Sequence, residues 1–253
     1  MPREARRKGS SGIYHIMLRG INKQTIFEDD EDRETFLEIL KKYKDRDKYV
    51  LYSYCLMDNH IHLLLRELEE PISQSLKRIS SSYVYWYNMK YDRCGHLFQE
   101  RFKSEIVDHD AYFITVIRYI HQNPLKAGMG NNVFESKWTS INEYLHHGDL
   151  IDRDAALQLF SEDKSQAIRR FCEYMKQANN DQCLEDRRKV KTADCDVREY
   201  LRQLGIENNS TLQQIDKETR DAILFKLKQL EGVSLRQLSR LTGISKSVIQ
   251  RAR

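Results

Sequence analysis

Long apolar runs are missing from this chain of 253 residues. No stretch approaches the roughly 18 consecutive apolar residues that a membrane-spanning helix needs. The first residues, Met1–Gly9, carry basic side chains with no apolar segment behind them, which is not the pattern of a secretory signal. We therefore expect a cytoplasmic protein that does not enter a membrane.

Closely spaced cysteines and a strong charge of one sign are also missing. Five cysteines are an odd number, and no two are paired at close spacing, so both a disulfide framework and a structural zinc site are disfavoured. The net charge of +4 permits a nucleic-acid partner without requiring one. Basic residues cluster at Arg3–Lys8, expected to be a solvated arm or a phosphate contact, and at Arg187–Lys191, expected in a charged linker.

Two histidines stand out on a predicted β-hairpin. Residues 49–65 form two apolar segments separated by Asp58-Asn59, and both residue types favour turns. His60 and His62 leave the second strand on one face, because strand side chains alternate, while Ile61 points to the other face. Two such imidazoles suit a divalent metal, although a half-buried strand with two surface histidines has the same pattern.

A helix predicted over residues 110–123 carries the second group. Phe113, Val116, Ile117 and Ile120 form its buried stripe at 100° per residue. Tyr119 and Asn123 lie on a neighbouring stripe, so that a hydroxyl and an amide share one edge of the packed face. Pro124 disfavours a helical conformation at Asn123 and can displace it. An ordinary core tyrosine also fits this position.

The predicted elements follow the order strand, helix, strand, strand, helix, strand, helix. The first strand is expected at 13–18, the first helix at 31–43 after Asp29 or Asp30, the second helix after Pro71, and the fourth strand within 98–107. Two such units give an α+β, ferredoxin-like antiparallel sheet with helices on one face. In that arrangement the last helix can place Tyr119 opposite His60 and His62.

Three motifs follow one another in the order of a known family. They are MDNHIHLLL at 57–65, GHLFQERFK at 95–103 and RYIHQNPLKAG at 118–128. Over about residues 10–145 the chain resembles the single-tyrosine transposases of the HUH endonuclease superfamily, most closely the branch associated with repetitive extragenic palindromes (REP). The resemblance implies a ferredoxin-like nuclease fold, a divalent metal such as Mg²⁺ or Mn²⁺, and single-stranded DNA folded into a hairpin as the substrate.

The resemblance also implies roles for individual residues. His60 and His62 match the two metal-binding histidines, Tyr119 matches the nucleophile, and Asn123 matches the polar residue that completes the metal site in relatives. Tyrosine attack would give a covalent 5′-phosphotyrosine intermediate and a free 3′-hydroxyl, so that a second 3′-hydroxyl can join a different strand. The segments that resemble the DNA-facing surface contain Arg19, Gln99, Arg101 and Lys103.

Other assignments stay open at this stage. A domesticated DNA-binding regulator would keep the fold without strand transfer, and a metal hydrolase that uses water would need the histidines but not Tyr119. Tyr112 could be mistaken for the nucleophile. A monomer and a homodimer are both compatible with the sequence. The histidines without a predicted partner, which we expect on the surface, are His96, His109, His121, His146 and His147.

The pattern changes after Tyr144. We expect the HUH nuclease domain over 1–148, a helical segment and charged linker over 149–193, and an all-α DNA-binding region over 194–253. Residues 233–253 resemble a helix-turn-helix with its turn at Thr242-Gly243, and a small structural helical hairpin is the alternative. In a helix-turn-helix, the residues facing the groove of duplex DNA would include Lys246, Gln250 and Arg251.

Overall fold

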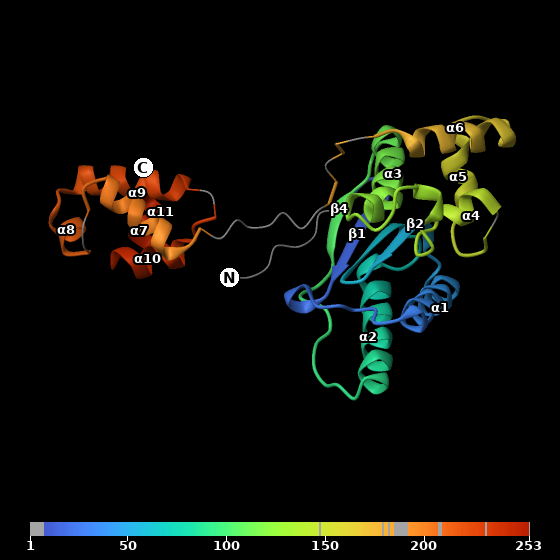
Figure 1. Cartoon of the computed structure of the whole chain (residues 1–253), viewed down its shortest axis with the longest axis horizontal. Helices are drawn as coiled ribbons and strands as arrows, with labels where there is room; N and C mark the ends of the chain where they lie inside the picture. The colour runs from blue at the N-terminus through green and yellow to red at the C-terminus, as the bar shows by residue number, and fades with distance from the viewer. Residues whose placement is uncertain are drawn as a thin grey trace. The chain divides into compact units, whose positions relative to one another are not determined.

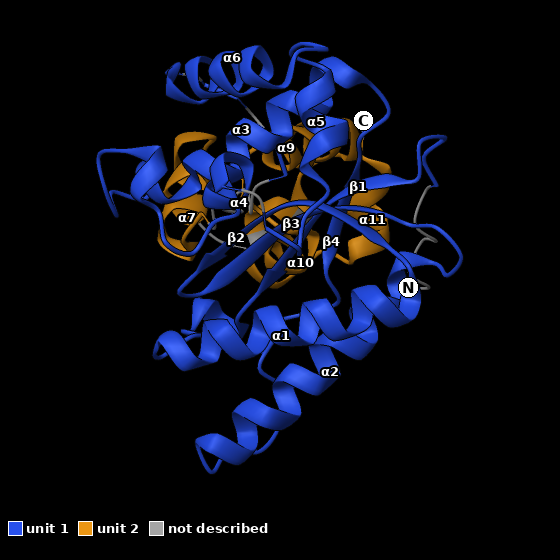
Figure 2. Ribbon diagram, turned by 90° about the vertical axis from the view of Figure 1, so that its right-hand side faces the viewer, with its two compact units in different colours: residues 1–185 blue, residues 186–253 orange. Residues whose placement is uncertain are grey.

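A computed structural model of the chain describes residues 8–146, 148–178, 180–181, 183–184, 192–206, 209–230 and 232–252. The chain divides into two compact units, unit 1 (residues 1–185) and unit 2 (residues 186–253), which Figure 2 distinguishes by colour. The basic clusters at Arg3–Arg7 and Arg187–Lys191 lie outside the described residues. No helix in the described part of the chain is both long and apolar enough to span a membrane.

Unit 1 is built on a four-stranded antiparallel sheet in the order β2-β3-β1-β4. Helix α1 connects β1 to β2, and helix α2 connects β3 to β4. The predicted element order is therefore confirmed, and the histidine-bearing strand β3 lies at the centre of the sheet beside β1. This is the strand and helix order of a ferredoxin-like sheet. The bounds are β1 (Ile13–Arg19), α1 (Asp30–Asp47), β2 (Val50–Met57), β3 (His60–Arg66), α2 (Ile72–Lys90) and β4 (Lys103–Ile106).

Helices cover both faces of this sheet, so the expectation of helices on one face is wrong for unit 1. Helices α1 and α2 lie on one side of the sheet (Figure 1). The opposite side carries α3 (Asp110–Lys126), α4 (Ile141–His146), α5 (Arg153–Gln158) and α6 (Lys164–Lys176). The physical reason is that α3 has an apolar stripe of its own, Phe113, Val116, Ile117 and Ile120, which is buried on this second face.

Local sequence signals explain where the key elements begin and end. The side chain of Asp29 accepts the N–H of Asp32 and so caps α1, with Asp32 completing a reciprocal capping box. Asp58 and Asn59 form the two-residue turn between β2 and β3. Asn123 is not displaced by Pro124, because α3 continues to Lys126 and the N–H of Ala127 donates to the carbonyl of Asn123 at 3.0 Å.

The predicted domain boundary near residue 148 falls inside unit 1. The ring of Phe171 on α6 is fully buried and stacks on Tyr144 of α4, with centroids 4.4 Å apart. The side-chain amide of Gln122 on α3 donates to the carbonyl of Met175 at 2.6 Å, and Arg118 pairs with Asp181 at 2.8 Å. Leu150, Ala156, Phe171 and Met175 therefore belong to the core of unit 1.

Unit 2 is helical throughout its described residues and has its own apolar core. Val197, Leu224, Leu227 and Ile249 are fully buried in it. Ser234 caps α10, which ends at Gly243 with a φ of 71°, a left-handed conformation that glycine adopts readily. This turn joins the two short helices α10 and α11. The bounds are α7 (Asp194–Gln203), α8 (Asn209–Gln214), α9 (Lys217–Gln229), α10 (Leu235–Thr242) and α11 (Lys246–Arg251).

The position of α6 in the core of unit 1 can be tested by fluorescence, because both tryptophans of the chain, Trp86 and Trp138, lie in unit 1. Replacing Phe171 by alanine is expected to lower the free energy of unfolding of unit 1 by about 3–5 kcal/mol, the usual cost of a deleted buried aromatic ring. Urea unfolding followed by tryptophan fluorescence measures this. Leu159→Ala is the control, since Leu159 is 42% exposed and its loss is expected to cost less than about 0.5 kcal/mol. An unchanged midpoint in Phe171→Ala would place α6 outside this core.

Candidate active site

The two central strands bring polar side chains together on the face that α3 covers. In the antiparallel pair, Arg19 lies opposite His60 and Met17 lies opposite His62. Residues directly opposite each other share a face of the sheet, so both histidines point to the same side as Arg19 and Met17. His15 lies two residues before Met17 and therefore also belongs to this face.

Helix α3 places Tyr119 against these histidines. The ring centroid of Tyr119 is 5.6 Å from that of His62 and 5.7 Å from that of His15, both in edge-on contacts. One helical turn later, Oδ1 of Asn123 lies 3.4 Å from Nε2 of His60. The structure therefore brings His60, His62, Tyr119 and Asn123 together, as the spacing on strand and helix predicted. Tyr119 is buried, with 3% of its surface exposed.

The contact of His60 with Asn59 determines which nitrogen of the His60 ring carries an electron pair and not a proton. Nδ1 of His60 lies 2.6 Å from Oδ1 of Asn59, and the amide nitrogen of Asn59 donates to the carbonyl of Lys23. Since Oδ1 of Asn59 only accepts, a neutral His60 ring carries its proton on Nδ1. Nε2 of His60 and Oδ1 of Asn123 are then two acceptors that face each other. Such a pair fits a cation between them, and imidazole nitrogen with amide oxygen is a plausible donor set for Mn²⁺.

The donor set is small. Among the described residues, no group of three or more histidine, cysteine, aspartate or glutamate side chains is arranged to hold a metal ion. Two imidazoles and one amide oxygen from His60, His62 and Asn123 would leave coordination positions open, which is the arrangement of a catalytic rather than a structural site.

Sequence reasoning missed His15. This side chain is completely buried, and its Nε2 lies 2.9 Å from Nδ1 of His62. Burial lowers the pKa of His15 to about 3, and burial together with the neighbouring His15 and His60 rings lowers the pKa of His62 well below its usual value. Both imidazoles are therefore neutral at pH 7. The available signal was the alternation of β1, which puts His15 on the face opposite to Tyr14 and Ile16.

Tyr112, the other tyrosine on this edge of α3, has a different partner. Its hydroxyl donates to Oε2 of Glu105 on β4 at 2.6 Å. Burial and this bond to a carboxylate both raise the pKa of Tyr112. Its hydroxyl is thus engaged by Glu105 and not by His60 or His62.

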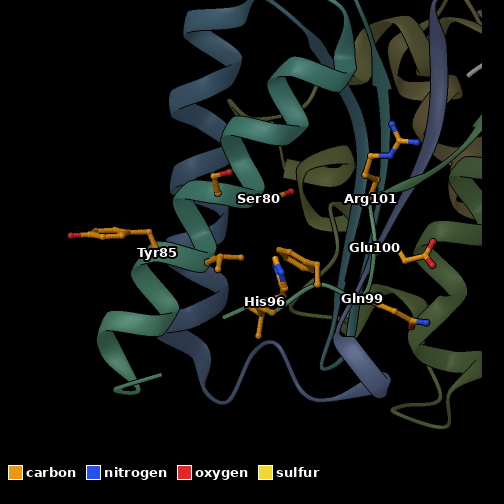
Figure 3. A pocket seen from close by; sticks show the side chains of 10 residues that line it. Ser80, Tyr85, His96, Gln99, Glu100 and Arg101 are labelled. Carbon is orange, nitrogen blue, oxygen red and sulfur yellow. The ribbon is translucent and has the colours of Figure 1, made fainter. Parts of the chain in front are cut away.

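The predicted DNA-facing residues of unit 1 lie along β1, β4 and the segment before β4. Arg19 is half-buried, whereas Gln99, Arg101 and Lys103 are exposed. The backbone N–H of Gln99 donates to the carbonyl of Arg19 at 2.8 Å, so residues 96–101 continue along the edge of β1 near His60. They also line a pocket of about 550 Å³ against α2, beside which Tyr85 projects away from the strands (Figure 3).

In unit 2, the predicted duplex-facing residues Lys246, Gln250 and Arg251 are all exposed on α11. Ile249, between them, is fully buried in the core of the unit. Helix α11 therefore has an apolar side that packs and a polar, basic side that faces outward.

His121 is not a surface residue, contrary to the expectation from sequence. It is completely buried on the side of α3 that packs inward, with Nε2 2.8 Å from Oγ of Ser140 and 3.2 Å from Oγ of Ser53. Because it follows Ile120 on the buried stripe and finds two hydroxyl partners, its ring can be buried without a charge. Burial lowers the pKa of His121 to about 3.

The family model described as "Transposase IS200 like" matches residues 9–123. Among solved structures, a REP-associated tyrosine transposase bound to a REP hairpin is similar at 14% identity and a TM-score of 0.52, covering 60% of this chain and 94% of that chain. A structure described as "a putative transposase from Deinococcus radiodurans R1" aligns at 16% identity and a TM-score of 0.34, covering 48% of this chain and 97% of that chain. No curated protein matches the chain.

The burial of His121 predicts a loss of stability in acid. Its pKa in the folded protein, about 3, lies below the value of about 6.5 in the unfolded chain, so below pH 6.5 the unfolded chain binds the extra proton and is favoured. Because of His121, the free energy of unfolding is expected to fall by about 2 kcal/mol between pH 7 and pH 5. Urea unfolding at the two pH values should show a smaller loss in His121→Gln than in the wild type. In the control His109→Gln, which changes an exposed side chain, the loss should equal that of the wild type.

Proposed function

We propose that this chain is a single-tyrosine DNA strand transferase that acts on single-stranded DNA carrying a hairpin. The premise is the match of residues 9–123 to the IS200-like transposases. One observation carries the proposal: α3 sets the ring of Tyr119 against His62 and the amide of Asn123 against His60. A phenol, two imidazoles and an amide are the groups that metal-assisted attack on a phosphodiester uses.

The metal would be held by His60, His62 and Asn123. The electron pairs of Nε2 of His60 and Oδ1 of Asn123 already face one point, 3.4 Å apart. When bound, Mg²⁺ or Mn²⁺ would withdraw charge from a nonbridging phosphate oxygen and make the phosphorus easier to attack. Ligation requires both imidazoles to be neutral.

Tyr119 would be the nucleophile. Its phenolic oxygen forms the new bond to phosphorus, the bond from phosphorus to the 3′ oxygen breaks, and that oxygen leaves with a proton as a 3′-hydroxyl. The 5′ phosphate stays on the tyrosine, so the reverse reaction with a different 3′-hydroxyl joins a new strand. Lys126 places a positive charge beside this ring, with its ammonium 4.8 Å from the ring centre. Since Tyr119 is 3% exposed, the proposal requires that DNA binding open a path to its hydroxyl.

The DNA strand would follow β1 and the segment that precedes β4. Arg19, Arg101 and Lys103 supply positive charge there for the phosphates, and Gln99 supplies an amide. That a similar structure is described as bound to a REP hairpin supports a hairpin as the substrate. Unit 2 would add a second contact, in which α10 and α11 act as a helix-turn-helix and the basic side of α11 meets duplex DNA.

The adduct between protein and DNA provides the direct test. We expect a hairpin oligonucleotide labelled at its 3′ end to become attached to the full-length protein when Mn²⁺ is present, because the fragment with the 5′ phosphate stays on the tyrosine. Tyr119→Phe should abolish the adduct, and EDTA should do the same. Tyr112→Phe, which removes a hydroxyl from the same edge of α3, should retain it. Denaturing electrophoresis measures the attached label.

The other outcomes separate the alternatives. Cleavage that survives in Tyr119→Phe would identify a hydrolase that uses water. Binding of the hairpin without any cleavage, with hairpins of several sequences, would identify a regulator that keeps the fold. Adduct formation in Tyr119→Phe would mean that another side chain is the nucleophile.

The role of α11 is tested by salt dependence. In a Tyr119→Phe background, Arg251→Gln is expected to weaken binding to duplex DNA and to reduce the slope of log affinity against log salt by about 1, the value for one phosphate contact. Arg202→Gln is the control, because this arginine is exposed on α7 and pairs with Glu199. Fluorescence anisotropy over a salt series measures both. Equal slopes in the wild type and Arg251→Gln would leave α10 and α11 as a structural hairpin.

A further inference from the structure

One buried contact beside the candidate metal site has no role in the proposed strand transfer. Nε2 of His15 and Nδ1 of His62 lie 2.9 Å apart, and the two residues are 0% and 1% exposed. A hydrogen bond at this distance needs one proton between the two nitrogens, carried by one ring and accepted by the other. Which ring carries it decides what His62 can do.

The two possibilities have opposite consequences for His62. If His15 donates from Nε2, then Nδ1 of His62 accepts, and the proton of a neutral His62 must be on Nε2, where it blocks metal binding. If His62 donates from Nδ1, its Nε2 keeps a free electron pair and can bind a cation. In this second arrangement Nε2 of His15 accepts, so the proton of His15 is on Nδ1.

Glu105 favours the second arrangement. It lies directly opposite His15 in the pairing of β1 with β4, and its Oε2 is 3.9 Å from Nδ1 of His15. The hydroxyl of Tyr112 donates to the same oxygen at 2.6 Å and keeps the carboxylate in place. Among the described residues, Nδ1 of His15 has no hydrogen-bond partner, so the negative charge of Glu105 is what the structure offers to a proton on that nitrogen.

His60 is held in an equivalent way from its other side. Its Nδ1 contacts Oδ1 of Asn59 at 2.6 Å, which also leaves Nε2 as the unprotonated nitrogen of a neutral ring. The two candidate ligands thus reach the same tautomer through different partners. For His60 the partner is the neighbouring residue in the turn, whereas for His62 it is a buried ring on the adjacent strand.

We propose that His15 is a positioning residue that, with Glu105 behind it, fixes His62 in the tautomer with its proton on Nδ1 and its Nε2 free for the metal. The contacting groups follow one another in the order Glu105 carboxylate, His15, His62 and cation. It extends the common arrangement in which a carboxylate orients a metal-binding histidine by one additional imidazole. The part of this inference that concerns the metal rests on the proposed function, whereas the tautomer of His62 does not.

The tautomer is measured in the full-length protein without metal or DNA. Two-bond ¹H–¹⁵N correlation spectra distinguish a protonated from an unprotonated imidazole nitrogen, and His62→Gln assigns the signals of His62. We expect Nδ1 of His62 to be protonated in the wild type. His15→Phe keeps a ring of similar size but removes the acceptor, so His62 should shift toward protonation on Nε2. His15→Gln restores an acceptor at the position of Nε2 and should restore the wild-type tautomer.

Metal affinity gives the second measurement. Titration with Mn²⁺ alone, followed by calorimetry, is expected to show about 10-fold or weaker binding in His15→Phe, the usual effect of losing the partner of a metal-binding histidine. Binding in His15→Gln should stay within about threefold of the wild type, and Glu105→Gln should fall between the two. Glu100→Gln, a change of an exposed carboxylate in the segment before β4, is the control for loss of charge. Thermal unfolding confirms that each variant is folded.

The outcomes separate this inference from the proposed function. Protonation of Nε2 of His62 in the wild type, or an unchanged His62 spectrum in His15→Phe, would overturn the role of His15. The expected tautomers together with no Mn²⁺ binding to any variant would support the role of His15 in orienting His62 and would instead contradict the metal site. If His15→Phe does not fold, the variants His15→Gln and Glu105→Gln still test the series of contacts from Glu105 through His15 to His62, by the spectrum of His62.

Discussion

The contact between α3 and the central strands of the sheet is the interaction on which the candidate site depends. The apolar stripe of α3 fixes the rotation of the helix, since Phe113 packs edge-on against Tyr52 at 4.9 Å and Ile117 and Ile120 are fully buried. With that rotation, Tyr119 and Asn123 can only lie over His62 and His60. Hydrophobic burial thus sets a distance between polar groups that those groups could not set by themselves.

This dependence explains the structural role of the residues that follow the segment matched by the family model. The family model ends at residue 123, yet the second half of α3 is held by later residues, through the pair of Arg118 with Asp181 and the bond from Gln122 to Met175. Both contacts lie within one turn of Tyr119. Helix α6 and the segment after it therefore hold in place the part of α3 that carries Tyr119. These contacts explain why they belong to unit 1.

Sequence predicted those features that local periodicity controls. The alternation of β3 put His60 and His62 on one face, the helical period put Tyr119 and Asn123 on one edge, and the Asp58-Asn59 turn fixed the hairpin. The features that depend on which elements meet were not predictable in the same way. His15 has no neighbour in the motif at 57–65 and gains its meaning only when β1 pairs with β3. His121 resembles a surface histidine until Ser53 and Ser140 are seen beside it.

The polar character of this sheet face is itself informative. The interface between this face and α3 buries three histidines, two from the sheet and one from the helix: His15, His62 and His121, each less than 2% exposed. A buried polar group adds little to stability even when it is hydrogen-bonded, and apolar residues of similar volume often serve equally well. His121 bonds its Nε2 to two serine hydroxyls, and like His15 it leaves its Nδ1 without a hydrogen-bond partner among the described residues. His15 and His62 bond to each other, and each buried nitrogen that stays unpaired on this interface costs about 1–3 kcal/mol. What separates His15 and His62 from His121 is their position, because their ring centroids lie 5.7 and 5.6 Å from that of the buried Tyr119. This position, more than the cost of burial, favours a role in the candidate site over packing alone.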